Sequence, residues 1–191
     1  FSGQKVQRLS IERMVDAIEH RGPNDRGTWV RQNVGLGHAR LSIVDKSSLA
    51  AQPMETNDST CSLIYNGEIY NYLEIKKDLE KLGCHFKSNS DTEVLLYALK
   101  IWGTSVLQRL NGMFAFAFFD KSKKQLILAR DRYGIKPLYT AIQNNKFYFG
   151  SEQKAFSHLP EFSRVLNKEA LIEYFTFQNF FTDQTLLKNV Q

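Results

Sequence analysis

The chain has 191 residues, of which 42% are hydrophobic and 24% are charged, and its formal net charge is +5. These fractions fit one globular domain with a sizeable core, and they exclude a disordered chain. The basic residues are scattered rather than gathered into a stripe with exposed aromatic side chains, so we expect no nucleic-acid partner.

Location and metal binding can also be anticipated from the sequence. No apolar run approaches the ~20 residues that span a bilayer, and the first residues lack the charged and apolar regions of a secretory signal. We therefore expect a cytoplasmic protein with no membrane partner. The two cysteines, Cys61 and Cys84, have no His or Cys at a zinc-binding spacing, so we expect neither a disulfide nor a metal site.

The first half of the chain is expected to form three helices and three strands. Ser10 is expected to cap the first helix, and Ser90 with Glu93 matches a capping box that opens the third. Gly83 is expected to end the second helix. The helices are placed at 10–21, 72–82 and 90–102, and the strands at 27–32, 34–44 and 61–65.

The second half begins with a run from Gly112 to Phe119 that is apolar on both faces, as is typical of a strand covered above and below. Further strands are expected at 125–130, 137–142 and 146–150, arranged as a meander, with short helices at 152–157 and 168–175. The strands come in adjacent groups instead of alternating with helices. The sequence therefore favours an α+β layered sandwich in a single domain, residues 1–191.

A hydrophobic strand runs directly into Asn66-Gly67-Glu68. The Asn66 side chain carries an amide donor, and Gly67 leaves its backbone N–H open to close approach, so the pair could hold the oxyanion that develops in acyl transfer. On the local pattern alone, Asn-Gly after a strand is first of all the signature of a tight hairpin turn. Both interpretations stay open at this point.

Two charged residues elsewhere in the chain extend this candidate site. Arg40 lies in an apolar strand and could grip a carboxylate through two parallel hydrogen bonds, although a structural pair with Asp45 would also explain it. Asp91 begins a helix, where plain capping is the alternative to ligand binding. Together with Glu68, these side chains supply one cation and two anions, which suits a free α-amino acid.

Several motifs in one order give the chain a family resemblance. It resembles the class II glutamine amidotransferase (N-terminal nucleophile glutaminase) domain of asparagine synthetases. The motifs that carry the resemblance extend nearly from end to end: His20-Arg21-Gly22-Pro23, the stretch 37–45, Asn66 to Asn71, Ser90 to Glu93, 112–117, 130–139 and Ser151 to Ala155.

The resemblance implies a four-layer αββα sandwich that hydrolyses L-glutamine to glutamate and ammonia. It implies that Asn66 with the Gly67 N–H forms the oxyanion hole and that Glu68 and Asp91 hold the α-ammonium group. The glutamine carboxylate region would be held by the side chain of Arg40 with the backbone of Leu41, Ser42, Ile43 and Val44. No cofactor is implied for this domain, whereas ATP and Mg are expected in a C-terminal synthetase domain of the same polypeptide.

The sequence departs from the family pattern in three ways. The family nucleophile is an N-terminal cysteine whose α-amino group acts as base; this chain starts at Phe1, and by analogy about six residues of the opening strand would be missing. No Ser-Gly-Gly-x-Asp-Ser pyrophosphate loop occurs, so the synthetase domain would be missing as well. Asn24 stands where the family usually has Asp.

We therefore expect the glutaminase domain of an enzyme that makes asparagine, inactive as the chain is given for lack of the cysteine. Two alternatives stay open: a catalytically inactive glutamine-binding regulatory module, and a purely structural interaction domain. A homodimer is a further open expectation, and the acceptor of the ammonia cannot be read from the sequence.

Overall fold

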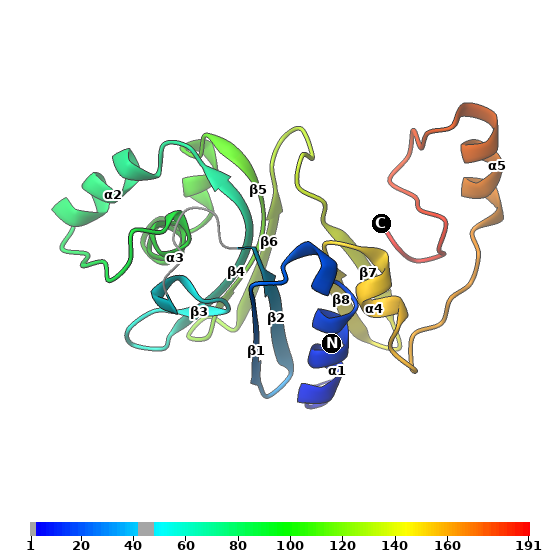
Figure 1. Cartoon of the computed structure of the whole chain (residues 1–191), viewed down its shortest axis with the longest axis horizontal. Coiled ribbons are helices and arrows are strands. Elements are labelled where there is room, and N and C mark those ends of the chain that lie inside the picture. The colour runs from blue at the N-terminus through cyan, green and yellow to red at the C-terminus, as the bar shows by residue number, and fades with distance from the viewer. Residues whose placement is uncertain (1–2, 42–47) are drawn as a thin grey trace.

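The computed structural model describes residues 3–41 and 48–191, and these form four layers (Figure 1). Helices α2 (Tyr72–Lys81) and α3 (Asp91–Trp102) cover one face of a four-stranded antiparallel sheet. Its order is β3-β4-β5-β6, and the strands are Met54–Glu55, Cys61–Ile69, Gly112–Asp120 and Gln125–Arg130.

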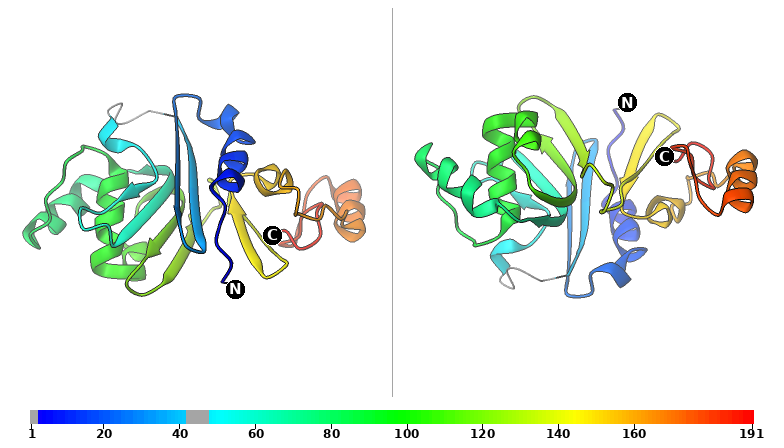
Figure 2. Two further views of the ribbon diagram at one scale, coloured as in Figure 1. Left: turned by 90° about the horizontal axis from the view of Figure 1, so that it is seen from below. Right: turned by 90° about the horizontal axis from the view of Figure 1, so that it is seen from above.

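The second β layer consists of two antiparallel hairpins that lie on the other side of the large sheet (Figure 2). One pairs β1 (Asp25–Arg31) with β2 (Val34–Arg40), and the other pairs β7 (Tyr139–Gln143) with β8 (Lys146–Gly150). Helices α1 (Arg8–Asp16) and α4 (Gln153–Ser157) form the outer layer. The expected α+β, four-layer αββα sandwich is confirmed.

A last helix, α5 (Lys168–Phe177), stands apart at the end of the chain (Figure 1). Three short 3₁₀ segments complete the described elements, at Glu19–Arg21, Ser48–Ala50 and Gly103–Gln108. No helix in residues 3–41 and 48–191 has both the length and the apolar character needed to cross a membrane.

The alternating side chains of β5 explain why this strand is buried on both faces. Phe114, Phe116 and Phe118 join the core that the large sheet shares with α2 and α3. Ala115 and Ala117 point to the opposite face and are also buried. Because the alanines are small, the second β layer can approach the sheet closely there.

The helix ends confirm part of the capping expectations. The Ser90 hydroxyl accepts the Glu93 N–H of α3 at 3.2 Å, as expected, but the Glu93 carboxylate accepts the N–H groups of Lys87 and Ser88 instead of that of Ser90. The expected cap at Ser10 is wrong. Helix α1 begins two residues earlier, where the side chain before it makes no capping hydrogen bond.

Two strand assignments also need correction. Strand β4 does not end at 65 but continues to Ile69, so Asn66 and Gly67 lie inside a paired strand opposite Ala115 and Phe114. The hairpin-turn interpretation of Asn66-Gly67 is therefore wrong. The expected meander is also wrong, because β6 pairs with β5 in the large sheet whereas β7 and β8 form a separate hairpin.

Candidate functional site

A cavity of about 320 Å³ opens where the ends of β2 and β4 meet the N-terminus of α3 and the loop after β6. Six residues expected in the site line this cavity: Arg40, Leu41, Asn66, Gly67, Glu68 and Asp91. The fold thus brings together residues that are far apart in the sequence. The remaining expected residues, Ser42, Ile43 and Val44, lie outside the described residues.

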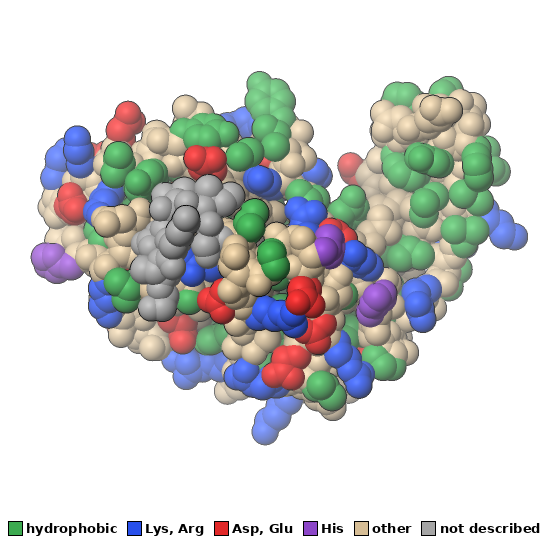
Figure 3. Space-filling model, in the orientation of Figure 1, with side chains coloured by type: hydrophobic (Ala, Val, Ile, Leu, Met, Phe, Trp, Pro, Cys, Tyr) green, Lys and Arg blue, Asp and Glu red, His purple; other side chains and the backbone are tan. Residues whose placement is uncertain are grey.

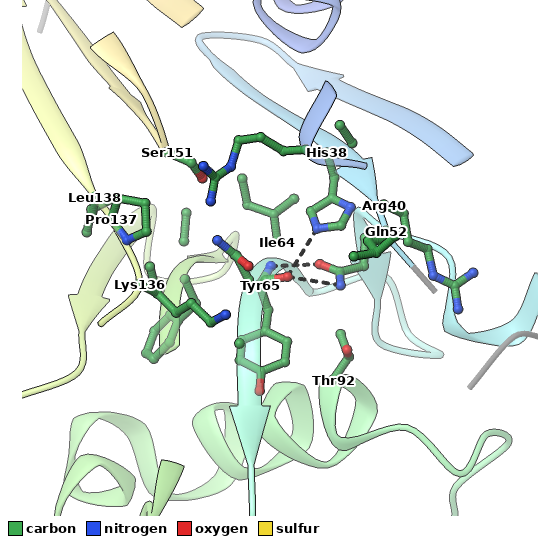
Figure 4. A pocket seen from close by; sticks show the side chains of 18 of the residues that line it. His38, Arg40, Gln52, Ile64, Tyr65, Thr92, Lys136, Pro137, Leu138 and Ser151 are labelled. Carbon is green, nitrogen blue, oxygen red and sulfur yellow. Dashed lines mark hydrogen bonds between the residues drawn. The ribbon is translucent and has the colours of Figure 1, made fainter. Parts of the chain in front are cut away.

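The backbone of β4 is fixed at Tyr65 by two side chains from other elements (Figure 4). The Gln52 amide accepts the Tyr65 N–H at 2.6 Å and donates to the Tyr65 carbonyl at 3.1 Å. The His38 Nε2 donates to the same carbonyl at 3.1 Å. This clamp precedes Asn66 by one residue, so it holds the part of β4 that lines the cavity.

Burial sets the protonation state of His38. Loss of solvent lowers the pKa of its imidazole to about 4, against the opposing effect of the hydrogen bond to Tyr65. Because a carbonyl can only accept, the proton of the neutral ring must be on Nε2. Nδ1 is then an unprotonated acceptor, and it is buried with no hydrogen-bond partner among the described residues.

Asp91 serves the fold as well as the cavity. Its Oδ2 accepts the Tyr65 hydroxyl at 2.7 Å and the Ile69 N–H at 3.1 Å, and the side chain is buried at the start of α3. Burial, followed by the Asp91 charge, raises the pKa of the Tyr65 phenol, so the phenol stays a donor. Asp91 therefore does more than cap a helix, because its hydrogen bonds connect the start of α3 to β4.

The alternation of hydrogen bonds along β4 gives the direction of the Gly67 N–H. Phe114 exchanges both of its backbone hydrogen bonds with Asp131, beyond the end of β6, so its N–H and C=O point away from β4. Gly67 lies opposite Phe114 and forms a non-hydrogen-bonded pair with it. In such a pair the backbone N–H and C=O groups of both residues point away from the partner strand, so the Gly67 N–H points away from β5.

The Gly67 N–H therefore lies on the cavity edge of β4, between two N–H groups with known acceptors. Tyr65 donates to Gln52 on one side, and Ile69 donates to Asp91 on the other. The Asn66 side chain alternates to the face opposite Tyr65, toward the second β layer. The Asn66 side chain and the Gly67 N–H thus belong to neighbouring residues that both line the cavity.

Gly67 is required by the sheet and not only by the cavity. A Cβ at this position would lie 2.2 Å from the Met113 carbonyl oxygen and 2.7 Å from the Phe114 Cα, both backbone atoms of β5. Phe114 is held on its other side by its two hydrogen bonds with Asp131, which oppose a movement of β5 away from β4. The glycine therefore allows the close strand approach that also exposes its N–H to the cavity.

A brace holds the Arg40 end of β2. Glu152 accepts from His20 at 2.8 Å and from Arg21 at 3.1 Å, which joins two motifs more than a hundred residues apart. Pro23 forms a bridge with Arg40, whose carbonyl accepts the Asn24 N–H at 3.1 Å. Asn24 thus contributes its backbone to this brace.

The Arg40 side chain is buried, and Lys136 approaches the cavity from the opposite side (Figure 4).

The loop between β6 and β7 forms the remaining wall and is built around Asp131. The buried Asp131 carboxylate accepts the N–H groups of Phe114, Tyr133, Ile135 and Lys136 at 2.9–3.2 Å. These hydrogen bonds lower the pKa of Asp131 although its desolvation acts in the opposite direction.

Sequence reasoning missed four residues that line or shape the cavity: His38, Gln52, Lys136 and Ser151. His38, Lys136 and Ser151 lie within the motifs that carry the family resemblance, so their place in those motifs could have indicated that they belong to the site. Gln52 had none, because its partner Tyr65 is defined only by the fold. No cluster of three or more His, Cys, Asp or Glu within residues 3–41 and 48–191 could hold a metal ion.

Comparison with known proteins gives this geometry a family. The model of the glutamine amidotransferase domain matches residues 1–191. The chain is 42% identical over 168 residues to asparagine synthetase (glutamine-hydrolyzing) 1 of Bacillus subtilis, covering 88% of this chain and 26% of that protein. It is 43% identical over 148 residues to amidase chry2 of Gibberella zeae, covering 76% of this chain and 22% of that protein.

Among solved structures, the glutamine phosphoribosylpyrophosphate amidotransferase of B. subtilis in complex with ADP and GMP shares the fold. Its TM-score is 0.70 at 22% identity, covering 81% of this chain and 41% of that chain. The chain spans about a quarter of the length of the curated relatives named above. The chain belongs to the glutamine amidotransferase domain family.

Proposed function

We propose that this domain hydrolyses the side-chain amide of L-glutamine and delivers ammonia to a synthetase domain of the same polypeptide, for asparagine synthesis. The observation that carries the proposal is the β4 edge, where Asn66 and Gly67 are consecutive strand residues that both line the cavity. Two donors there suit the oxyanion of an amide under nucleophilic attack. ATP and Mg belong to the synthetase domain in this proposal.

The charges around the cavity fit the other end of a free amino acid. Arg40 can hold the α-carboxylate through its planar guanidinium, assisted by the backbone after Leu41. Glu68 and Asp91 can hold the α-ammonium group, and both line the same cavity. The substrate amide is then directed to Asn66 and Gly67, with Tyr65 fixed behind them.

The nucleophile is proposed to come from a strand that precedes Phe1. A groove of about 840 Å³ lies between the hairpins, and Ile64, Phe119 and Leu126 of the large sheet line it. Apart from the single bridge between Pro23 and Arg40, the sheet partners of β2 and β8 in the described residues are β1 and β7 respectively. The groove can therefore accept one strand that pairs with both edges.

The direction of that strand follows from the groove's two ends. Gly3 to Val6 line the end near the hairpin tips at Asn33 and Asn145, whereas Gly37 and Phe149 also line the site cavity. A strand preceding Phe1 would thus run antiparallel to β2 and β8. Six residues span about 20 Å, roughly the length of β2, so an N-terminal cysteine would lie level with Arg40.

In this arrangement the cysteine thiolate attacks the glutamine carbonyl, and its own α-amino group accepts the thiol proton. An amine with a pKa near 8 suits this task at neutral pH. Attack forms the C–S bond and an oxyanion, and the C–N bond then breaks as the protonated amine gives its proton to the departing ammonia. Water, losing a proton to the same amine, attacks the thioester and releases glutamate and the thiolate. Asn66 and the Gly67 N–H stabilise the oxyanion in both steps.

The experiment compares the 191-residue chain with the same chain extended by a Cys-Gly-Ile-type strand. The extended protein should release glutamate from glutamine, and the unextended chain should not. A matched extension with Ser in place of the Cys should fold equally well and be inactive. Turnover by the unextended chain would refute the proposed source of the nucleophile. Glutamine binding without turnover in the extended protein would favour the regulatory alternative.

A further inference from the structure

The segment 165–181 exposes an apolar surface that the domain does not use. Only Ala170 of the ten residues of α5 is buried. The exposed large hydrophobic residues here are Val165, Leu166, Ile172, Tyr174, Phe175, Phe177 and Phe181, and Phe175 is 75% exposed. A helix that exposes several large apolar side chains close together is normally covered, so another surface should pack against it.

The segment also has an internal order that a disordered linker would lack. Asn167 caps α5 by accepting the Ala170 N–H at 3.3 Å, and Glu173 accepts the Phe181 N–H at 2.9 Å. The rings of Tyr174 and Phe180 stack at 5.4 Å, and those of Phe177 and Phe181 meet edge to face at 5.3 Å. The aromatic side chains are thus presented in a defined arrangement.

A second exposed apolar pair lies on the loop between β6 and β7. Tyr133 is 91% exposed and Ile135 is 58% exposed. Both belong to the loop whose backbone N–H groups donate to the Asp131 carboxylate. Arg130 fastens the same loop by donating to the carbonyls of Gly134 and Lys136. Hydrophobic side chains of this loop and of α5 flank a hollow in the molecular outline (Figure 3).

The end of the described chain leads toward this hollow. Gln191 exchanges two hydrogen bonds with Thr140 at 2.7 and 2.9 Å, and Val190 lies antiparallel to Ala141. Residues following Gln191 in a longer chain would therefore run beside Tyr139 toward Leu138, the last residue of the loop. The relatives have about three-quarters of their length outside the matched region, so they contain a body large enough to fill the hollow.

We propose that the α5 aromatic surface (Ile172, Phe175, Phe177, Phe181) and the loop pair Tyr133 and Ile135 together form the docking surface for the downstream domain of the same polypeptide. This inference rests on the proposed function. The exposed side chains offer apolar area on the order of 500 Å², which is one side of a typical interface between domains.

The position of the loop gives this docking surface a consequence for the site. Tyr133 and Ile135 face outwards, whereas Lys136 and Leu138 of the same loop line the site cavity. Since the Asp131 hydrogen bonds make the loop one rigid unit, a domain that packs on its outer side also fixes the inner wall. Docking and substrate binding are thereby linked through residues 131–138.

The test is hydroxyl-radical footprinting of the natural full-length protein, with each oxidation rate normalised to the intrinsic reactivity of the side chain. Phe175, Phe181 and Tyr133 should be oxidised at least about tenfold more slowly than Leu73 and Leu82, which are exposed on α2 and just after it. Equal normalised rates would overturn the proposal. Protection that disappears on dilution would also overturn it, because a second copy would then be the occupant.

A double variant tests whether the two patches share one partner. Phe175→Glu with Phe181→Glu should restore oxidation of Tyr133 to the level of the α2 leucines, while glutamine hydrolysis continues. If Tyr133 stays protected although the variant is folded, the common docking surface is refuted. Because footprinting requires no turnover, its outcome is independent of whether the proposed glutaminase activity is found.

Discussion

The β4 edge and α5 differ in how many of their interactions are made within the domain. The N–H, carbonyl and hydroxyl groups of Tyr65 all have hydrogen-bond partners within the domain, from β2, the Gln52 loop and α3. On α5, large aromatic side chains remain exposed. The contrast indicates that the β4 edge is organised before any ligand arrives, whereas α5 is organised for contact with another surface.

The largest expected effect breaks the oxyanion pair at the β4 edge. In the extended protein with its N-terminal cysteine, Asn66→Ala should lower kcat about 10²–10³-fold with KM changed far less, because an oxyanion donor acts mainly in the transition state. Steady-state glutaminase kinetics are the measurement. Asn66→Asp keeps the size and places a negative charge there, so it should be at least as inactive. Near-parental kcat in both variants would return Asn66 to a purely structural role.

The second effect concerns the clamp behind that pair. His38 has a pKa of about 4 in the folded state and about 6.5 in the unfolded chain. Between these two pH values the unfolded chain therefore binds more protons than the folded protein. The contribution of neutral His38 to the free energy of unfolding is fully present above pH 6.5 and is lost as pH falls toward 4. The shift corresponds to about 3 kcal/mol.

The measurement for the clamp is the free energy of unfolding against pH for the parent and for His38→Gln. The variant should be less stable at pH 7 and should lose less stability between pH 6.5 and 4, because it has no imidazole to protonate. Asp131 and the other carboxylates with lowered pKa remain in both proteins, so they cancel in the comparison. Parallel curves would show that His38 titrates normally.

A smaller effect tests the tight approach of β4 and β5. Gly67→Ala places a Cβ against the Met113 carbonyl, and we expect a loss of about 1–3 kcal/mol in the free energy of unfolding. Denaturant unfolding is the measurement. Gly83→Ala is a useful comparison, because its positive φ strains any side chain but nothing lies within 4 Å of the added carbon. If Gly67→Ala unfolds like the parent, the strands are less constrained than the register indicates.

Local patterns predicted the elements that depend on neighbours in sequence. Strands β5, β6 and β8, and the end of α2 before Gly83, begin or end where hydrophobic periodicity and turn residues placed them. The errors arose where tertiary pairing decides the outcome. Asn66-Gly67 carries a turn signal, yet pairing with β5 keeps it in a strand.

The site shows the same division. The motif resemblance predicted that Arg40, Glu68 and Asp91 share one site, and all three line one cavity. The hydrogen bonds that Asp91 accepts from Tyr65 and Ile69 could not be predicted, because they depend on how α3 packs on β4. Gln52 could not be found from the sequence, because its role depends on facing Tyr65 across the layers. The roles of the individual site residues in glutamine binding stay predictions.

The smallest expected effect sharpens the contrast between the two regions. In the 191-residue chain, Phe175→Ala should change the free energy of unfolding by less than about 0.5 kcal/mol, because the ring is mostly exposed. Among the described residues, only Tyr174 offers it a ring contact, at 6.3 Å. Phe118→Ala is the matched control, since the same substitution in the core should cost about 3–5 kcal/mol. Denaturant unfolding measures both. If Phe175→Ala costs as much as the core control, α5 belongs to the domain's own packing, and its aromatic surface would no longer be available to another domain.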